Sequence, residues 1–514
     1  MRLTIEIERV MFTLRLAAVI VLCLFSVTQL YTQTRRFVAY DAKREMRGIW
    51  VATVNNIDWP SSPGLSQEQI KREARNILDR VKRMGMNTVF LQVRPSADAI
   101  YRSDIEPMTS YVVGETDKLS PDFDALTYWI DEAHRRGLEL HAWINPFRVT
   151  PKADFPCGLN HLSKTHPEWT ITYAGRQYLN PGLPEARAYV ARVVDDITTR
   201  YDIDGIHFDD YFYPYPVRGE VFDDNATYEQ YRNVGESVDD WRRRNVNAVI
   251  NYVSTLIKNR KPWVAFGISP FGVWRNKRDD VRGSQTVAGI TDYDILYADV
   301  VEWIKRGWVD YIVPQIYWES GNKAADFDEL TAWWAALACD ATQVYVGHAI
   351  FKINAGNKAW ENPSEMPQQI EKVRNDGRLS GSVFFSYRQF NRDIFGLEDA
   401  MRNSIYRSRS LSPLVMNRSN GNITITNISV RDNKIVWETR GASDQVRFYA
   451  IYRYRKGDDF NASRNTYLVD IVGDAEMPIP IPPTSDREKY YYRISAIDIN
   501  RNEHPLSAKL SIKY

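Results

Sequence analysis

The sequence predicts a (β/α)8 barrel of the TIM type followed by a small β-sandwich, and three observations lead to this prediction. Short β-branched or aromatic runs alternate eight times with longer segments of helical periodicity. The long insertions follow strands, whereas the helix-to-strand connections are short, as in barrels whose cleft is built at one end. Beyond about residue 412, the pattern changes to alternating strands separated by Asn, Asp, Gly and Pro turns.

Residues 1–33 are typical of a signal peptide or leader. Arg15 precedes an uncharged run of about a dozen residues, 16–27, and polar residues follow it. This length matches a signal-peptide core and falls short of the roughly 20 residues that a membrane-spanning helix needs. We therefore expect export to the periplasm or cell envelope. Leu22 stands before Cys23 where lipoprotein processing wants a small residue, which disfavours a lipid anchor.

Residues 40–410 form the predicted barrel. The expected strands are 47–54, 87–93, 138–144, 204–209, 263–269, 310–316, 343–349 and 381–386. The expected helices are 67–84, 122–136, 184–200, 236–260, 293–306, 326–338, 364–376 and 395–406. Gly85, Gly137, Gly307 and Gly377 fall where helices stop, which predicts left-handed C-terminal caps. An open doubly wound sheet could use the same units, but no glycine-rich phosphate fingerprint follows the first strand.

Residues 413–514 form the predicted β-sandwich. Strand patterns begin at Ile423, Lys434, Val446 and Tyr490, and the tyrosine-rich last pattern resembles a fibronectin type III domain. Modules of that kind usually act as spacers or docking surfaces. We therefore expect this one to contact an envelope or division protein and to have no catalytic role.

Composition excludes several classes of partner and site. The 66 Lys and Arg residues balance the 65 Asp and Glu residues, so the chain has no basic field for nucleic acid. Fifteen Trp and thirty Tyr residues suit stacking on sugar rings, although most such rings in a large domain are core. Cys157 and Cys339 are placed too far apart to bridge, and no metal-ligand spacing is present, so we predict no metal and no cofactor.

The fourth strand ends in two carboxylates followed by aromatic residues, Asp209-Asp-Tyr-Phe-Tyr213. Strand alternation puts His207, Asp209 and Tyr211 on one face and predicts that Asp210 points the other way. A carboxylate at the end of a strand is costly to bury, so we favour a functional role for Asp209 over a cap on the next element.

Polar and aromatic side chains also gather at the other strand ends, where a barrel is otherwise filled by branched apolar residues. We expect the following residues to bind substrate: Asn55, Gln92, Arg94, His141, Trp143, Asn145, Arg148, His207, Tyr211, Tyr213, Trp274, Gln315, Tyr317 and Trp318. For the two histidines, a buried and hydrogen-bonded place in the core is the alternative. No Gly-x-Ser-x-Gly elbow or His-Glu-x-x-His helix is present, and the remaining acids, amides and rings suit a carbohydrate site.

Several motifs occur together in order: Arg47-Gly-Ile-Trp50, Leu91-Gln-Val-Arg94-Pro, His141-Ala-Trp-Ile-Asn145-Pro, Asp204-Gly-Ile-His-Phe-Asp-Asp-Tyr-Phe-Tyr-Pro214, Ile268-Ser-Pro-Phe-Gly272 and Pro314-Gln-Ile-Tyr-Trp318. With them, residues 44–406 resemble the glycosyl-hydrolase-like 10 family of bacterial exported proteins. The resemblance implies a (β/α)8 barrel and a cell-wall glycan substrate. That family includes a hydrolase of "denuded" peptidoglycan strands, which lack stem peptides.

The fourth-strand motif is also similar to the Asp-Gly-x-Asp-x-Asp-x-Glu strand of chitinase-type barrels, but Tyr211 holds the position of the proton-donating Glu. Tyrosine is a poor acid at neutral pH. We therefore expect Asp209 to be the nucleophile, the base or the orienter of the substrate's N-acetyl group. Glu319, with its pKa raised by Trp318, or Asp210 then donates the proton. The alternative for Glu319 is a solvated loop charge.

The leading interpretation is an exported glycoside hydrolase that cleaves peptidoglycan glycan strands lacking stem peptides. The alternative is a non-catalytic glycan-binding barrel protein of the cell envelope, which keeps the groove without turnover. A sugar deacetylase is a third interpretation, which the missing metal triad disfavours.

Overall fold

The computed structural model describes residues 43–114, 118–392, 394–415, 421–480 and 489–514. The predicted signal peptide lies outside the described residues. Across the described parts of the chain, no helix combines the length and apolar character that crossing a membrane requires. The described residues from 43 onward belong to one compact unit that contains both the parallel sheet and the C-terminal antiparallel sheets.

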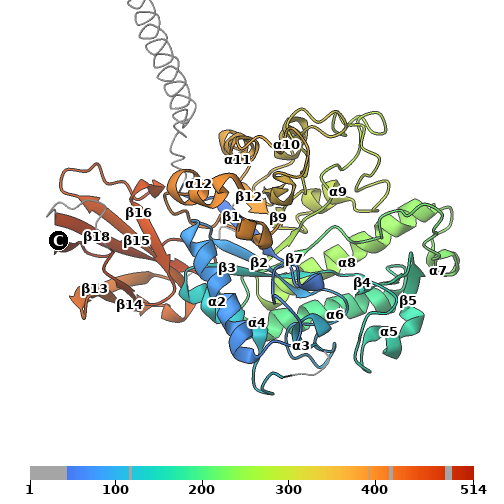
Figure 1. Cartoon of the computed structure of the whole chain (residues 1–514), viewed down its shortest axis with the longest axis horizontal. Coiled ribbons are helices and arrows are strands. Elements are labelled where there is room, and N and C mark those ends of the chain that lie inside the picture. Colours follow the sequence, from blue (N-terminus) through green and yellow to red (C-terminus); the bar gives the residue numbers. More distant parts are fainter. Residues whose placement is uncertain (1–42, 115–117, 393, 416–420, 481–488) are drawn as a thin grey trace, which may run out of the picture. The chain divides into compact units, whose positions relative to one another are not determined.

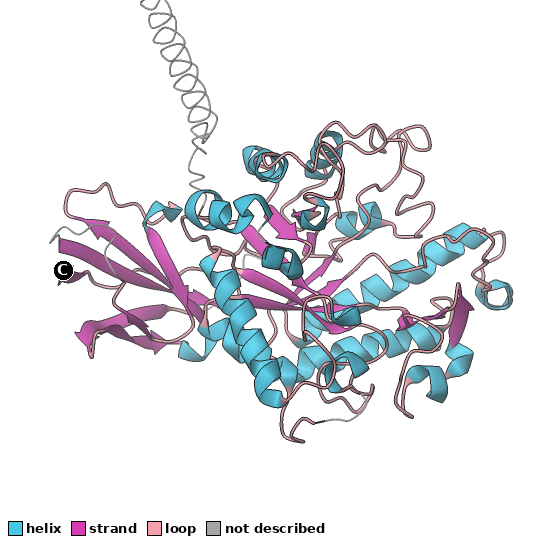
Figure 2. Ribbon diagram, viewed as in Figure 1, coloured by secondary structure: helices cyan, strands magenta, loops and turns pink. Residues whose placement is uncertain are grey.

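A parallel sheet lies at the centre of the first part of this unit, with helices around it (Figures 1 and 2). Its strands are β1 (Met46–Val51), β2 (Thr88–Arg94), β3 (Glu139–Ile144), β7 (Gly205–Phe208), β8 (Ala265–Ile268), β9 (Tyr311–Ile312), β10 (Gln343–Val344), β11 (Val346–His348) and β12 (Gly381–Phe384). All eight predicted strand segments are confirmed, and the predicted segment 343–349 contains both β10 and β11.

The sheet closes on itself through this divided segment. The strand order is β10-β9-β8-β7-β3-β2-β1-β12-β11, so β10 and β11 stand at its two ends. Only Tyr345 separates them along the chain, and its backbone N–H donates to Ile312 O on β9 over 2.9 Å. β10 pairs with β9 and β11 pairs with β12. One extended segment therefore joins both edges and makes a barrel.

Each strand segment is followed by a helix, as predicted. These helices are α2 (Gln67–Arg83), α4 (Ala125–Arg135), α6 (Pro184–Arg200), α8 (Val238–Arg260), α9 (Val300–Lys305), α10 (Phe327–Ala335), α11 (Glu365–Asn375) and α12 (Leu397–Ala400). Ser66 begins α2 with a capping box to Gln69, and Gly85 follows its end with φ of 80°. Gly137 and Gly307 also have positive φ, but Gly377 does not, so the cap predicted there is wrong.

The insertions after strands carry further helices and strands. They are α3 (Ser110–Val113), β4 (Arg148–Thr150), α5 (Leu162–Thr165), β5 (Thr170–Tyr173), β6 (Arg176–Leu179) and α7 (Asn225–Tyr231). β4, β6 and β5 pair in that order as a small antiparallel sheet.

Two antiparallel sheets form the C-terminal part, shown in orange and red in Figure 1. Their strands are β13 (Ile423–Arg431), β14 (Lys434–Gly441), β15 (Val446–Arg455), β16 (Leu468–Val472), β17 (Glu476–Pro478), β18 (Lys489–Asp498) and β19 (Leu510–Lys513). The orders are β13-β14-β17 and β16-β15-β18-β19. The four predicted strand segments are confirmed, and the likeness to fibronectin type III stays a prediction.

Candidate active site

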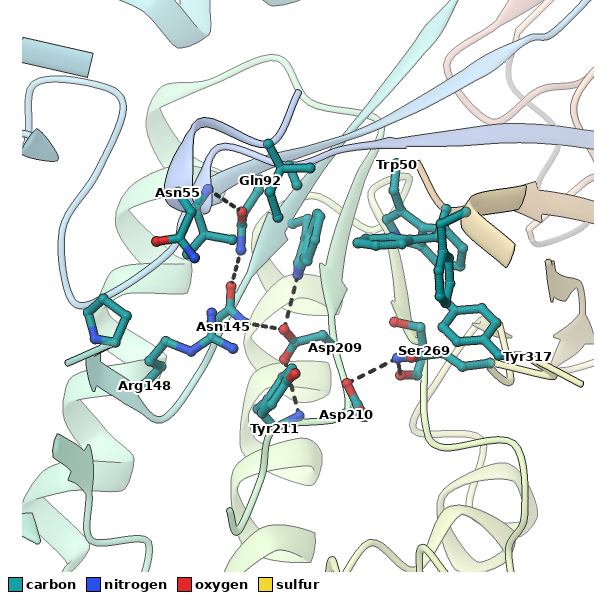
Figure 3. A pocket seen from close by; sticks show the side chains of 18 of the residues that line it. Trp50, Asn55, Gln92, Asn145, Arg148, Asp209, Asp210, Tyr211, Ser269 and Tyr317 are labelled. Carbon is teal, nitrogen blue, oxygen red and sulfur yellow. Dashed lines mark hydrogen bonds between the residues drawn. The ribbon is translucent and has the colours of Figure 1, made fainter. Parts of the chain in front are cut away.

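A cavity of about 370 Å³ opens at the carboxyl ends of the barrel strands. The residues that line it are Trp50, Ala52, Val54, Asn55, Ile57, Gln92, Trp143, Asn145, Arg148, Pro151, Arg176, Asp209, Asp210, Tyr211, Ser269, Gln315, Tyr317, Phe351 and Phe385. They come from β1, β2 and β3 and from the segments that follow most of the other strands (Figure 3). This is the end of a parallel barrel at which active sites lie.

Asp209 and Asp210 both line this cavity, which corrects the prediction that they face opposite ways. The prediction extended the strand through Asp210, whereas β7 ends at Phe208 and the chain bends at Asp210. Strict alternation holds only while the backbone stays extended. The bend therefore turns the second carboxylate to the same cavity as the first.

Three hydrogen-bond donors hold the carboxylate of Asp209, which is 3% exposed. Asn145 Nδ2 and Trp143 Nε1 donate to Oδ2, the latter over 3.4 Å, and the backbone N–H of Tyr211 donates to Oδ1 over 3.3 Å. Burial and the charge of Asp210 nevertheless raise the pKa of Asp209 to about 7. A carboxyl with this pKa can hold a proton near neutral pH.

Asp210 receives its side-chain hydrogen bonds from different donors than Asp209 does. Gln315 Nε2 donates to its Oδ1 over 3.0 Å, and the Tyr215 hydroxyl donates to its Oδ2. Burial raises the pKa of Asp210, while these two donors oppose the rise. Because the two carboxyls are adjacent and buried, their protons are best assigned to the pair rather than to either residue.

A fixed chain of amides positions Asp209. Gln92 Oε1 accepts the backbone N–H groups of Thr53 and Val54, each over 2.9 Å. The Gln92 Nε2 group therefore donates to Asn145 Oδ1 over 2.5 Å. Because its Oδ1 is held in this way, Asn145 turns its NH2 group toward Asp209 and donates to it. The orientation of the two amides follows from this network, and both residues are fully buried.

The two predicted histidines lie in the barrel interior and do not line the cavity. Trp50 Nε1 donates to His207 Nε2 over 3.1 Å, so the proton of that imidazole is on Nδ1, which faces the Tyr311 hydroxyl at 3.2 Å. The same hydroxyl is 2.8 Å from His141 Nδ1. Burial lowers the pKa of His207 far below its usual value, so the ring is neutral. Both histidines are buried and hydrogen-bonded in the core, which is the alternative that the sequence left open for them.

Arg94, Tyr213, Trp274 and Trp318 also lie outside the residues that line the cavity. Arg94 pairs with Glu106 at 2.6 Å and donates to the carbonyl of Asn145, so it fixes the loop after β3. Tyr213 and Trp274 are buried against other aromatic rings, and Trp318 packs edge-on to Phe271. The structure places these four residues outside the cavity lining, and their contact with substrate stays a prediction.

Glu319, the first predicted acid candidate, is turned away from the cavity lining. Asn322 Nδ2 donates to it over 3.0 Å, Trp360 Nε1 over 3.1 Å and Asn357 Nδ2 over 3.4 Å. Burial opposes ionisation, but these donors hold the pKa of Glu319 below its usual value. The expected rise in its pKa is therefore wrong, because the aromatic neighbour is a donor, Trp360, rather than an apolar wall.

Ten of the predicted residues line the cavity: Asn55, Gln92, Trp143, Asn145, Arg148, Asp209, Asp210, Tyr211, Gln315 and Tyr317. Sequence reasoning missed Arg176, Phe351 and Phe385, which belong to an insertion or follow late strands, and Tyr215, whose only signal was the aromatic run after Asp210. Burial raises the pKa of Tyr211 to about 12, which agrees with its exclusion as an acid.

The chain matches known proteins over most of its length. The profile of the family described as "Glycosyl hydrolase-like 10" matches residues 45–363. Glycosyl hydrolase YngK of Bacillus subtilis (strain 168) is 38% identical over 488 residues, 91% of this chain and 93% of that protein. Glycosyl hydrolase DigH of Escherichia coli (strain K12) is 37% identical over 377 residues, 68% of this chain and 85% of that protein.

Among solved structures, the PgaB (BpsB) glycoside hydrolase domain of Bordetella bronchiseptica aligns with a TM-score of 0.46 and 12% identity, over 70% of this chain and 99% of that domain. A superposition at that level decides neither activity nor substrate. The profile match over more than half of the chain, together with the two relatives, shows that the chain is a glycoside hydrolase of the glycosyl hydrolase-like 10 family.

Proposed function

We propose that this enzyme hydrolyses the β-linked GlcNAc–MurNAc backbone of peptidoglycan strands that have lost their stem peptides. The observation that supports the chemistry is the Asp209–Asp210 pair, two buried carboxyls with raised pKa in one cavity. Glycoside hydrolysis needs one carboxyl that is protonated and one that is ionised. A coupled pair that shares a proton near neutral pH supplies both.

In the proposed reaction, the protonated member of the pair gives its proton to the oxygen of the departing sugar as the C1–O bond breaks. The ionised member stabilises the positive charge that develops at C1, directly or by orienting the N-acetyl oxygen toward it. Water then adds to C1 and returns a proton to the carboxylate that gave one up. With Glu319 outside the cavity, the pair provides both functions.

The walls suit a chain of N-acetylated sugars. Trp50, Trp143, Tyr317, Phe351 and Phe385 present aromatic rings to the cavity. Such rings bind the apolar faces of pyranoses, while fixed amides hydrogen-bond the hydroxyl and acetamido groups. Export to the periplasm or cell envelope, proposed from residues 1–33, would place the enzyme where this polymer occurs.

The test is digestion of amidase-treated and untreated peptidoglycan by wild type, Asp209→Asn, Asp210→Asn and Glu319→Gln, followed by chromatography of the soluble saccharides. Asn keeps the shape of Asp but cannot donate or accept the proton. We expect wild type and Glu319→Gln to release stem-free saccharides at comparable rates, and each Asn variant to lose roughly 100-fold or more. Full activity in either Asn variant would remove that carboxyl from the mechanism, and no release by wild type would refute the substrate.

A further inference from the structure

Two arginines from paired strands line the cavity. Arg148 begins β4 and Arg176 begins β6, and both line the cavity. Arg148 is paired in register with Tyr178, and Arg176 lies two residues before Tyr178 on the same strand. Residues two apart on a strand share a face, so the β4–β6 pairing presents both guanidinium groups on the cavity side.

These guanidinium groups differ from the other arginines around the barrel mouth. Arg94 pairs with Glu106, Arg242 with Asp224, and Arg275 with Asp294. Across the described residues, neither Arg148 nor Arg176 has an acidic side chain within ion-pair distance; Arg148 instead lies over the Tyr211 ring, 4.5 Å from its centroid. Two cations without acidic partners beside an open cavity form a site for an anion.

The position of the two arginines indicates where on the substrate the bound anion is attached. The charge of Arg148 lowers the pKa of both Asp209 and Asp210, so it acts on the same space as the catalytic pair. Arg176 has an exposed side chain and lines the same cavity as the two carboxyls. The anion therefore belongs to a group attached close to the bond that is cleaved.

We propose that Arg148 and Arg176 bind the carboxylate of the lactyl ether on a MurNAc residue, and that this contact selects strands without stem peptides. The inference rests on the proposed function. An attached peptide converts that carboxylate into a neutral amide, whereas removal of the peptide leaves a free anion. Arginine recognises a carboxylate through paired N–H donors in one plane, a geometry that an amide cannot satisfy.

The experiment compares two substrates that differ only in this charge. Amidase-treated strands carry free lactyl carboxylates, and the same strands coupled to methylamine carry neutral amides of similar size. We expect wild type to prefer the free carboxylate about 10- to 100-fold in kcat/KM, the range for hydrogen bonds to a charged group. Arg176→Gln should lose most of this preference through KM, and Arg148→Gln/Arg176→Gln should lose the rest.

Two further variants separate recognition from folding. Arg218→Gln removes an exposed arginine that is not among the residues lining the cavity, and it should keep the wild-type preference. Arg176→Lys keeps the charge without the planar fork and should retain part of the preference. Equal cleavage of both substrates by wild type, or an unchanged preference in Arg176→Gln, would overturn this inference alone. Cleavage of neither substrate by wild type would overturn the proposed function and this inference with it.

Discussion

Arg501, which follows the last long strand of the C-terminal sheets, forms a two-point ion pair with Glu139, the first residue of barrel strand β3. Arg501 Nε lies 2.7 Å from Glu139 Oε1, and Nη2 lies 2.8 Å from Oε2. Burial opposes ionisation of this carboxyl, but the Arg501 guanidinium and the His141 ring hold the pKa of Glu139 down to about 2. The C-terminal part therefore completes the amino-terminal end of the barrel and is more than a spacer.

Neighbouring contacts extend this relationship. Arg447 Nε lies 3.1 Å from Asp204 Oδ1, and Lys82 Nζ lies 2.6 Å from Asp470 Oδ1. A Cβ on Gly137 would stand 2.2 Å from the Ile471 carbonyl oxygen, so the backbone there admits only glycine. Contact with an envelope or division protein, predicted for the C-terminal part, remains a proposal and would use its remaining surface.

The first prediction concerns the stability that this ion pair contributes. Arg501→Met leaves Glu139 charged and buried without its partner, so we expect the free energy of unfolding to fall by about 3–5 kcal/mol. Urea unfolding followed by tryptophan fluorescence measures it. Arg440→Met, at an exposed strand position, should change it by less than about 0.5 kcal/mol. A loss in Arg501→Met no larger than in this control would contradict the prediction.

The second prediction assigns the two carboxyls their functions. A variant that lacks the proton donor should cleave an aryl glycoside with an acidic leaving group nearly as well as wild type, because that group leaves without a proton. The variant that lacks the ionised carboxylate should remain inactive on both kinds of substrate. Steady-state rates of Asp209→Asn and Asp210→Asn on natural strands and on the aryl glycoside provide the measurement. The same loss on both substrates in both variants would argue against a division of function.

The third prediction concerns pH. The raised pKa of Asp209, about 7, means that the pair loses its shared proton as pH rises through neutrality. We expect kcat/KM to fall above about pH 7. On the aryl glycoside, this fall should be absent in the Asn variant that has lost the proton donor but keeps measurable activity. A rate that stays level to pH 9 would exclude a carboxyl acid with this pKa.

The raised pKa of Asp209 also makes the stability of the folded protein depend on pH. The folded state holds the Asp209 proton to about pH 7, whereas an ordinary Asp releases it near 3.8. Between pH 3.8 and about pH 7, the folded protein binds more protons than the unfolded chain. The contribution of Asp209 to the free energy of unfolding therefore falls as pH rises through this range. Asp209→Asn should therefore unfold with less loss of stability between pH 4 and pH 7 than wild type, as measured by urea titration at each pH.

The fourth prediction concerns Gln92, a positioning residue that acts through Asn145. Gln92→Glu cannot donate to Asn145 Oδ1, so the amide that holds Asp209 loses its fixed orientation. We expect kcat to fall about 10- to 100-fold with little change in KM, since the misplaced group is the reacting carboxyl rather than a binding wall. Gln69→Glu, in the capping box of α2, is the control and should leave both constants unchanged. An effect of Gln92→Glu confined to KM would contradict this account.

The sequence by itself determined the order of the eight barrel units, the strands of the C-terminal sheets and most of the cavity wall. These features follow from local patterns: a period of two for strands, a period near 3.6 for helices, and polar residues where parallel strands end. Gln92, Asn145, Asp209 and Gln315 could be placed together because the carboxyl ends of parallel strands meet at one end of a barrel.

Only the tertiary structure decided which of the remaining residues meet. Asp210 reaches the cavity because β7 ends two residues before it, and Glu319 leaves it because Trp360, Asn322 and Asn357 supply hydrogen bonds elsewhere. Arg176 and Arg501 arrive through strand pairing and packing across long separations in sequence. The physical reason is that side-chain direction beyond a regular element depends on the partners that folding brings near, which no local period encodes.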